Sequence, residues 1–383
     1  MKVLIVRNYP SYMEVKNNTY NIQEVGLAKA LVKKKYECDI LFWTEGEEEE
    51  IKLHVEQKSI TVYYRRAFSI LKNTIYTQVK DLFEKYDVIQ SSEYNQLESV
   101  WLAAKYPKKT IVYHGPYFSD FNKRYNLYCK IFDKLFLWIY IRKNTKFITK
   151  SELASEYLIS KGLNENNVTT IGVGIDAEML TCEKIDLNSR VYSNIHREGG
   201  LKILYVGKVE PRRNVVMIVE IVRRIKEKVP NVQLYIIGSG NEEYIQKVKT
   251  NIFKFDLVDN VTWEYSMEQK HLGEIYKMAD IFLLPTEYEI FGMVLLEAMY
   301  YGMLVLTTNN GGAKTLIRNG KNGFVLAKND IDAWVEIIEN YYYKKNEFKN
   351  IKEEAQRTVK NKFTWDALVN NFIEEYRRLE EYE

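Results

Sequence analysis

The sequence predicts an α/β protein with two doubly wound βαβ domains that face each other across a cleft. The chain has 383 residues, more than a single core usually holds. Short apolar and β-branched runs alternate with longer helical patterns, which is typical of parallel sheets covered by helices. The alternation weakens between Glu183 and Gly200 and restarts at Leu201. We therefore expect two domains joined by a connection.

The first domain is predicted over residues 1–182. Helical patterns from Glu24 to Lys35 and from Asn95 to Lys105 separate its strands, and the acidic run from Glu45 to Glu50 is interpreted as a solvated loop. The strand candidates are KVLIVR from Lys2, CDILFW from Cys38, DVIQSS from Asp87, KTIVYH from Lys109, KFITKS from Lys146 and VTTIGV from Val168.

A linker over 183–200 leads to the second domain, predicted over 201–364. Its strand candidates are LKILYVG, VQLYIIG, VTWEY, IFLLPT, MLVLTT and GFVL. Residues 365–383 form an amphipathic helical pattern with a charged outer face. Ligands of open α/β sheets bind beyond the carboxyl ends of the strands, so the loops that follow these runs are the places to search for a site.

Composition excludes several classes of protein. The hydrophobic share of 46%, the charged share of 28% and the net charge of +3 are those of a globular protein that needs no nucleic acid partner. Cys38, Cys129 and Cys182 have no paired spacing, which argues against a disulfide framework and a zinc site. No apolar run is long enough for a signal peptide or a membrane span. We expect a cytoplasmic protein, and peripheral contact with the inner face of a membrane stays open.

The stretch EIFGMVLLE follows the strand candidate IFLLPT and carries the most specific pattern. A helix is expected to begin near Gly292, where the N–H groups of Phe291, Gly292 and Met293 would form an anion site. Glycine lets a diphosphate approach the backbone closely. Glu289 could reach a sugar hydroxyl and Glu297 a ribose diol. In the alternative interpretation, Glu289 only favours the helix dipole and Glu297 faces solvent.

A basic loop, GKVEPRRN, follows the first strand candidate of the second domain. It places Lys208, Arg212 and Arg213 where the leaving diphosphate of a nucleotide-sugar donor would need positive charge. These side chains would make a metal ion unnecessary. A solvated basic loop is the alternative. The sequence Asp330-Ile-Asp332 has the form of a metal-binding element, but we interpret Asp330 as the N-cap of the following helix.

His114 follows the strand candidate KTIVYH and is one of four histidines. As a lone histidine it could be a residue whose hydrogen bonds are satisfied, or one exposed to solvent. If the two domains face each other, it points from the first sheet toward the donor site.

In this order, these residues resemble the retaining family 4 of nucleotide-sugar glycosyltransferases, whose GT-B architecture has two facing Rossmann-like domains. The resemblance covers nearly the whole chain and is most specific at the pair Glu289 and Glu297, eight positions apart. It implies Lys208 and Arg213 on the donor diphosphate, where the family more often has arginine and lysine respectively. It further implies Glu289 on the transferred sugar, Glu297 on the ribose and His114 near the reacting carbon.

The resemblance also implies a set of residues that contact the donor or the acceptor. Val261 to Tyr265 would lie beside the base, and the 365–383 helix would pack back across the domain boundary. Asn18 to Asn21 replace the family's paired-glycine loop, and Thr315 stands where an acidic residue is usual. The residues expected to bind the donor or the acceptor are Gly207, Phe291, Gly292, Met293, Val261, Trp263, Tyr265, Asn18 and Thr19.

The reaction implied is transfer of a hexosyl or N-acetylhexosaminyl group with retention, and a donor phosphate oxygen would act as the base. It needs no side-chain nucleophile, cofactor or metal. The donor is most often UDP-linked, and the acceptor is a hydroxyl of a glycan, a lipid-linked or a protein-linked molecule. Synthesis of bacterial surface polysaccharide or glycoconjugate is the expected setting. Two rival functions stay open: a non-catalytic binding or assembly partner, suggested by the altered 18–21 loop, and an enzyme of the same architecture that epimerises or phosphorolyses sugars.

Two segments of the first domain, TVYYRRAFSILKNTIYTQVKDLFEKY and NKRYNLYCKIFDKLFLWIYIRKNTK, interleave basic and aromatic residues. Such a surface could sit on anionic lipid and reach a lipid-linked glycan. Alternatively, the second segment is an ordinary helix whose core stripe is Tyr125, Tyr128, Phe132, Leu135 and Ile139.

Overall fold

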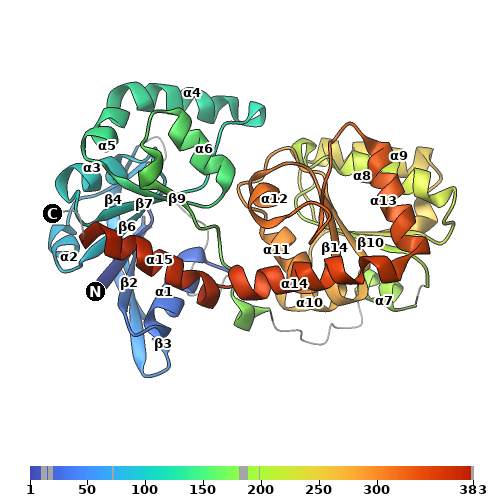
Figure 1. Cartoon of the computed structure of the whole chain (residues 1–383), viewed down its shortest axis with the longest axis horizontal. Coiled ribbons are helices and arrows are strands. Elements are labelled where there is room, and N and C mark those ends of the chain that lie inside the picture. Colours follow the sequence, from blue (N-terminus) through green and yellow to red (C-terminus); the bar gives the residue numbers. More distant parts are fainter. Residues whose placement is uncertain (10–14, 16–19, 71–72, 181–188, 198, 381–383) are drawn as a thin grey trace. The chain divides into compact units, whose positions relative to one another are not determined.

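The computed structural model describes residues 1–9, 15, 20–70, 73–180, 189–197 and 199–380 (Figure 1). It consists of two compact units. Unit 1 comprises Met1–Asp176 and Thr364–Glu383, and unit 2 comprises Ala177–Phe363. Each unit has a mainly parallel sheet between helices, as the alternation in the sequence predicts.

The sheet of unit 1 has the strand order β3-β4-β2-β1-β6-β7-β8-β9, and β5 pairs with β4. Buried apolar residues fill the central strands because helices cover both faces, with α1 and α15 on one face and α3 to α6 on the other (Figure 1). The strands are β1 (Lys2–Val6), β2 (Glu37–Thr44), β3 (Glu49–Val55), β4 (Lys58–Ile70), β5 (Asn73–Tyr76), β6 (Val88–Ser92), β7 (Thr110–His114), β8 (Lys146–Thr149) and β9 (Val168–Thr170), and the helices are α1 (Gln23–Lys33), α2 (Lys80–Glu84), α3 (Leu97–Lys105), α4 (Lys123–Phe132), α5 (Trp138–Arg142), α6 (Glu152–Ser160) and α15 (Trp365–Glu380).

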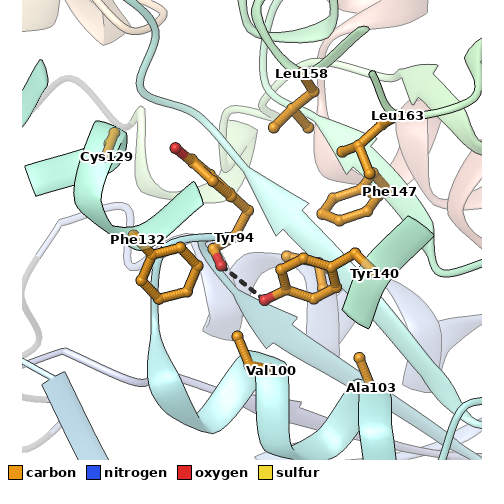
Figure 2. Packing of buried hydrophobic residues seen from close by; sticks show 10 residues of the cluster. Tyr94, Val100, Ala103, Cys129, Phe132, Tyr140, Phe147, Leu158 and Leu163 are labelled. Atoms are coloured by element: carbon orange, nitrogen blue, oxygen red, sulfur yellow. Dashed lines mark hydrogen bonds between the residues drawn. The ribbon is translucent and has the colours of Figure 1, made fainter. Parts of the chain in front are cut away.

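A cluster of buried side chains joins the α3 to α6 layer to the sheet (Figure 2). Tyr94 lies at its centre, and Phe132 and Phe147 are buried with it. The hydroxyl of Tyr140 donates to the carbonyl oxygen of Tyr94 at 2.7 Å, so this buried tyrosine has its polar atom satisfied. Tyr125, Tyr128 and Ile139 pack against the cluster, as the core-stripe interpretation predicts, but Leu135 is exposed.

The sheet of unit 2 is entirely parallel, with the order β12-β11-β10-β13-β14-β15. Loops that follow β10, β11, β12 and β13 therefore gather at one edge. The strands are β10 (Lys202–Val206), β11 (Gln233–Ile237), β12 (Val261–Glu264), β13 (Ile281–Leu284), β14 (Leu304–Thr307) and β15 (Phe324–Val325), and the helices are α7 (Arg190–Arg197), α8 (Val215–Lys226), α9 (Glu242–Lys254), α10 (Gln269–Met278), α11 (Met293–Tyr300), α12 (Gly311–Leu316), α13 (Ile331–Tyr343) and α14 (Lys349–Lys362).

The strands β3, β4 and β5 are not among the predicted strands, and the predicted acidic loop ends inside β3. Glu49 begins β3, which pairs with β4 in antiparallel register. Exposed and less exposed residues alternate along β3, as in an edge strand with one solvated face. Arg65 on β4 forms an ion pair with Glu50, so part of the first basic and aromatic segment is a strand rather than a free basic surface.

The predicted linker is partly helical. Helix α7 belongs to unit 2, where Val191 and Ile195 are buried and the Ser189 hydroxyl donates to Glu264 at 2.7 Å. Its apolar residues are too few for the helical period to stand out from the surrounding polar sequence. Residues 183–188 lie outside the described part of the chain.

Helix α15 is part of unit 1, and Trp365 fixes its first turn. The indole is 3% exposed and lies between Gly26 and Gly174, where an added Cβ would come within 2.1 Å and 2.5 Å of the ring. The backbone N–H of Trp365 donates to the carbonyl oxygen of Ile175 at 3.2 Å. Two glycines therefore provide the space that this large side chain fills.

A buried carboxyl group on α3 predicts a pH-dependent stability. Glu98 is 1% exposed, and its Oε2 accepts from the Tyr76 N–H at 3.1 Å, whereas Oε1 has no hydrogen-bond partner among the described residues. Burial raises the pKa of Glu98 to about 8, although the bond from the Tyr76 N–H lowers it. Because the folded state holds this proton more tightly, the stabilisation is complete below the unfolded pKa and is lost as the pH rises toward 8.

We therefore expect Glu98→Gln to make the stability less dependent on pH. The wild-type free energy of unfolding should fall by about 1.4 kcal/mol per pH unit from this group between about pH 5 and 8, and the variant should lack that contribution. Urea unfolding of the full chain, followed by circular dichroism across this range, measures the difference. Parallel pH profiles for the two proteins would contradict the assignment.

Among the described residues, no helix has both the length and the apolar character needed to cross a bilayer.

Candidate active site

Two loops at the carboxyl edge of the unit 2 sheet are bonded to each other. Residues 207–214 follow β10 and residues 285–292 follow its neighbour β13. Arg212 Nη1 donates to the carbonyl oxygen of Tyr288 at 2.7 Å, and the Glu287 N–H donates to the carbonyl oxygen of Arg212 at 2.9 Å. Arg212 thus holds the basic loop against the loop that carries Glu289.

Arg213 and Glu289, two predicted site residues, form an ion pair between Nη1 and Oε2. Their side chains are only 12% and 16% exposed. The sequence separates them by 76 residues, and the neighbouring positions of β10 and β13 bring them together. Attraction between poorly hydrated charges is strong, so each residue depends on the other for charge compensation.

Helix α11 begins as the sequence predicts. Gly292 is its N-cap, with φ of +82°, a left-handed conformation that favours glycine. The first N–H groups of a helix have no partner within it, so those at Gly292 and Met293 are oriented to receive an anion. The Phe291 side chain is buried, so only its backbone could take part.

Two glycines of α12 fix the turn before α11. The Gly311 N–H donates to the carbonyl oxygen of Glu289 at 3.0 Å, and a Cβ on Gly312 would lie 1.6 Å from the carbonyl oxygen of Phe291. Only glycine permits this approach. Thr315 donates its hydroxyl to the Gly311 carbonyl oxygen within the same helix, at 2.9 Å.

Glu297 lies inside α11 and does not face solvent as the alternative interpretation supposed. Its side chain is 2% exposed, and the Tyr276 hydroxyl on α10 donates to Oε2 at 2.9 Å. A carboxylate in this setting keeps a fixed orientation.

A cavity of about 830 Å³ opens beside the basic loop. Gly207, Lys208 and Tyr265 line it, and so do several residues outside the sequence prediction: Gly238, Ser239, Gly240, Asn241, Glu242 and Ser266. For four of these residues, Gly238 to Asn241, the signal was the sequence GSGN directly after the strand VQLYII.

The floor of the cavity is a close contact between the loops after β10 and β11. The Val209 N–H donates to the Ser239 carbonyl oxygen at 3.0 Å, and the Asn241 N–H donates to that of Val209 at 2.9 Å. A Cβ on Gly238 would lie 1.8 Å from the carbonyl oxygen of Gly207. These glycines therefore allow two loop backbones to touch.

The predicted stretch from Val261 to Tyr265 is only partly at this cavity. Val261 begins β12 and so lies at the amino end of the strand, away from the edge where ligands of parallel sheets bind. Trp263 donates its Nε1–H to the Gly238 carbonyl oxygen at 2.9 Å and supports the cavity floor. Tyr265, just beyond the strand, lines the cavity.

In unit 1, His114 belongs to a buried cluster of charged residues. Its Nδ1 lies 2.7 Å from Oε2 of Glu93, which also accepts from the Gly115 N–H at 3.0 Å. Lys150 donates to Oε1 of Glu93 at 3.2 Å. Burial alone would raise the pKa of Glu93, but Lys150, the bond from His114 and the Gly115 N–H together lower it to about 2.

The ionised Glu93 determines the protonation of the histidine ring. A carboxylate only accepts hydrogen bonds, so Nδ1 of His114 must carry the proton. The Nε2 atom is buried and has no hydrogen-bond partner among the described residues. Glu93 and Lys150 are not among the predicted site residues, although Glu93 directly follows one predicted strand and Lys150 lies near the end of another.

A second buried ion pair lies at the same edge of the unit 1 sheet. Arg7, just after the end of β1, donates to Glu24 of α1 at 2.9 Å and 2.5 Å, and its guanidinium stacks on Phe42 at 4.3 Å.

Two predicted site residues, Asn18 and Thr19, lie outside the described residues. In the part of the chain that the structure covers, no group of three or more His, Cys, Asp and Glu residues could hold a metal ion. Asp330 Oδ1 accepts from the Ala333 N–H at 3.2 Å, which confirms its predicted role as an N-cap.

Comparison with known proteins identifies the class. The model described as "Glycosyl transferases group 1" matches residues 192–358, and that of "Glycosyltransferase Family 4" matches residues 25–179. Glycosyltransferase family models thus match both parts of the chain, and its fold is that of the GT-B glycosyltransferases. Within that class it is similar to family 4, as the sequence motifs predict.

The capsular polysaccharide biosynthesis glycosyltransferase CapM of Staphylococcus aureus is 28% identical over 60% of this chain and 63% of its own. A 41.2 kDa protein in the cps region of Klebsiella pneumoniae is 25% identical over 63% of this chain and 65% of its own. The chain thus spans slightly less than two thirds of these relatives. Among solved structures, Anabaena HepE in complex with UDP superposes with a TM-score of 0.74 at 16% identity, covering 99% of this chain and 100% of HepE, which reflects the shared fold.

Proposed function

We propose that this protein transfers a hexosyl or N-acetylhexosaminyl group from a UDP-sugar, with retention, to a hydroxyl of a glycan, lipid-linked or protein-linked acceptor. The setting would be synthesis of a bacterial surface polysaccharide or glycoconjugate. The observation that carries the proposal is the buried pair of Arg213 and Glu289, which lies between the start of α11 and the basic loop.

The chemistry supports a donor diphosphate at this edge of the sheet. Negative charge develops on the diphosphate as the sugar leaves, and fixed positive charges and N–H dipoles stabilise it. Arg213, Lys208 and the first N–H groups of α11 supply both. When the diphosphate binds, it would share the Arg213 guanidinium with Glu289, and a Glu289 oxygen would then be available to a sugar hydroxyl.

The nucleoside would occupy the cavity beside Lys208 and Tyr265. In this proposal Glu297 accepts hydrogen bonds from the ribose diol. UDP is chosen because solved structures of HepE hold UDP and UDP-glucose, and the surface polysaccharide setting is chosen because CapM acts in capsule synthesis. Metal independence is part of the proposal because two basic side chains provide the positive charge.

Nucleotide binding to the full chain tests the donor proposal. UDP should raise the melting temperature more than GDP or ADP. Glu297→Gln should weaken UDP binding about 10- to 100-fold, because a hydrogen bond to a charged group contributes about 1.5–3 kcal/mol. Glutamine can still accept from the Tyr276 hydroxyl, whereas alanine would remove that acceptor. Glu274→Gln on α10, a partly exposed carboxylate, is the matched control and should bind as the wild type does.

Turnover distinguishes the rival functions. A transferase should slowly hydrolyse the UDP-sugar, with or without a chelator, and the sugar first released should keep the donor's anomeric configuration by NMR. A binding partner would bind UDP without releasing sugar. An epimerase would return a nucleotide sugar of altered stereochemistry. If none of the three nucleotides binds, the donor proposal is wrong.

A further inference from the structure

The outer side of α4 and α5 carries an apolar stripe in a basic surround. One continuous helical segment runs through α4, the π-helical turn Asp133–Leu137 and α5, and it lies on the outside of unit 1 (Figure 1). Five large apolar side chains along it are between 50% and 60% exposed, and we call them the outer stripe: Leu127, Ile131, Leu135, Trp138 and Ile141. Their spacing of four, four, three and three residues places them on one side of a helix.

The outer stripe is not needed for the core. The opposite side of the same segment already packs on the sheet through Phe132 and Tyr140, which are buried (Figure 2). Soluble proteins rarely leave a contiguous row of large apolar side chains in water, and such a row marks a surface that another apolar phase covers.

The charges around the stripe have one sign. Asp133 is the segment's acidic residue, and it turns inward, where it pairs with Lys161 and accepts from the Tyr94 hydroxyl at 3.1 Å. Every exposed charged side chain from 123 to 143 is therefore basic: Lys123, Arg124, Lys130, Lys134, Arg142 and Lys143. Six cations beside an apolar row match an anionic lipid surface, where headgroups attract lysine and arginine and apolar side chains enter the acyl boundary.

We propose that unit 1 docks on anionic phospholipid membranes through the outer stripe and its basic surround. The interaction is peripheral: the segment lies in the plane of the interface, with Ile131, Leu135 and Trp138 inserted and the lysines at the headgroups. This inference goes beyond the proposed sugar transfer and does not depend on it, because lipid binding is measured without donor or acceptor.

Sedimentation of the full chain with vesicles tests the proposal. Binding to phosphatidylcholine vesicles that contain phosphatidylglycerol should be at least about tenfold tighter than to phosphatidylcholine alone, since each basic residue near such a surface contributes about fivefold. The variant Ile131→Ser/Leu135→Ser/Trp138→Ser replaces three exposed side chains of the outer stripe, and its affinity for these vesicles should be at least about tenfold weaker. Lys130→Glu/Lys134→Glu should lose as much, together with most of the salt dependence.

Matched controls change equally exposed residues of unit 2. Phe253→Ser/Val258→Ser removes two exposed apolar side chains, and Lys349→Glu/Lys360→Glu reverses two exposed lysines. Both should bind vesicles as the wild type does, and all variants should keep the wild-type circular dichroism spectrum. The proposal would be overturned if the wild type bound neither kind of vesicle, or if the stripe variants bound vesicles as tightly as the wild type. It would also be overturned if the wild type were a dimer that the serine variant converts to a monomer, because the stripe would then be an interface between copies.

Discussion

Glu289→Ala is expected to lower the rate of sugar release from the donor by about two to three orders of magnitude and to destabilise unit 2 by about 3–5 kcal/mol. The first effect follows from the proposed role of Glu289, whose carboxylate would hold a hydroxyl of the transferred sugar in position. The second arises because Arg213, only 12% exposed, would be left without charge compensation.

The double variant Arg213→Met/Glu289→Leu separates the two effects. Removing both charges should restore most of the stability but none of the activity, because the buried charge disappears while the donor site stays incomplete. Glu287→Ala is the control from the same loop. Its ion pair with Lys328 is more exposed, so its removal should cost less than about 1 kcal/mol. Denaturant unfolding measures the stability of each variant, and release of nucleotide from the donor measures its activity. A double variant no more stable than Glu289→Ala would show that the charges are not coupled.

Glu93→Ala is expected to have a comparable effect in unit 1, about 3–5 kcal/mol of stability. The buried charge of Lys150 would lose its carboxylate partner, and the Gly115 N–H would lose its acceptor. In the wild type, the low pKa of Glu93 means that its stabilisation is present above the unfolded value near 4.5 and is lost as the pH falls toward 2.

Glu93→Gln/Lys150→Met tests the role of Glu93 in orienting His114. The amide oxygen can still accept from Nδ1–H, and neither residue of the Glu93–Lys150 pair carries a charge, so stability should largely return. Nitrogen NMR of the imidazole should show the proton on Nδ1 in the wild type and in this double variant, but not in Glu93→Ala. A wild-type spectrum with the proton on Nε2 would contradict the assignment. That His114 lies near the reacting carbon of the donor sugar stays a prediction.

The central strands were predictable because they are buried on both faces and read as short apolar runs between helical patterns. The runs KVLIVR and LKILYVG correspond to β1 and β10 within two residues. Strands β3 to β5 escaped prediction because they lie toward one edge of the sheet, where polar residues such as Glu49 and Arg65 replace the apolar signal.

Local signals also explain what was predicted of the candidate site. The start of α11 at Gly292 follows from one glycine after a strand. The pairing of Arg213 with Glu289 and of Glu297 with Tyr276 depends on which strands and helices become neighbours, which no local pattern states. The membrane and core interpretations of α4 and α5 do not exclude each other. The core uses one side of this helical segment, and the opposite side is exposed.

The placement of α15 has a consequence for the order in which the protein is made. Ile175 and Thr364 pair as neighbours, although all of unit 2 lies between them in the chain. Unit 2 is thus an insertion within unit 1, and it can leave the ribosome and fold as one uninterrupted segment. During that time the space between Gly26 and Gly174 stays open to water. Only after the ribosome has passed Phe363 can Trp365 close it, so unit 1, begun first, is finished last.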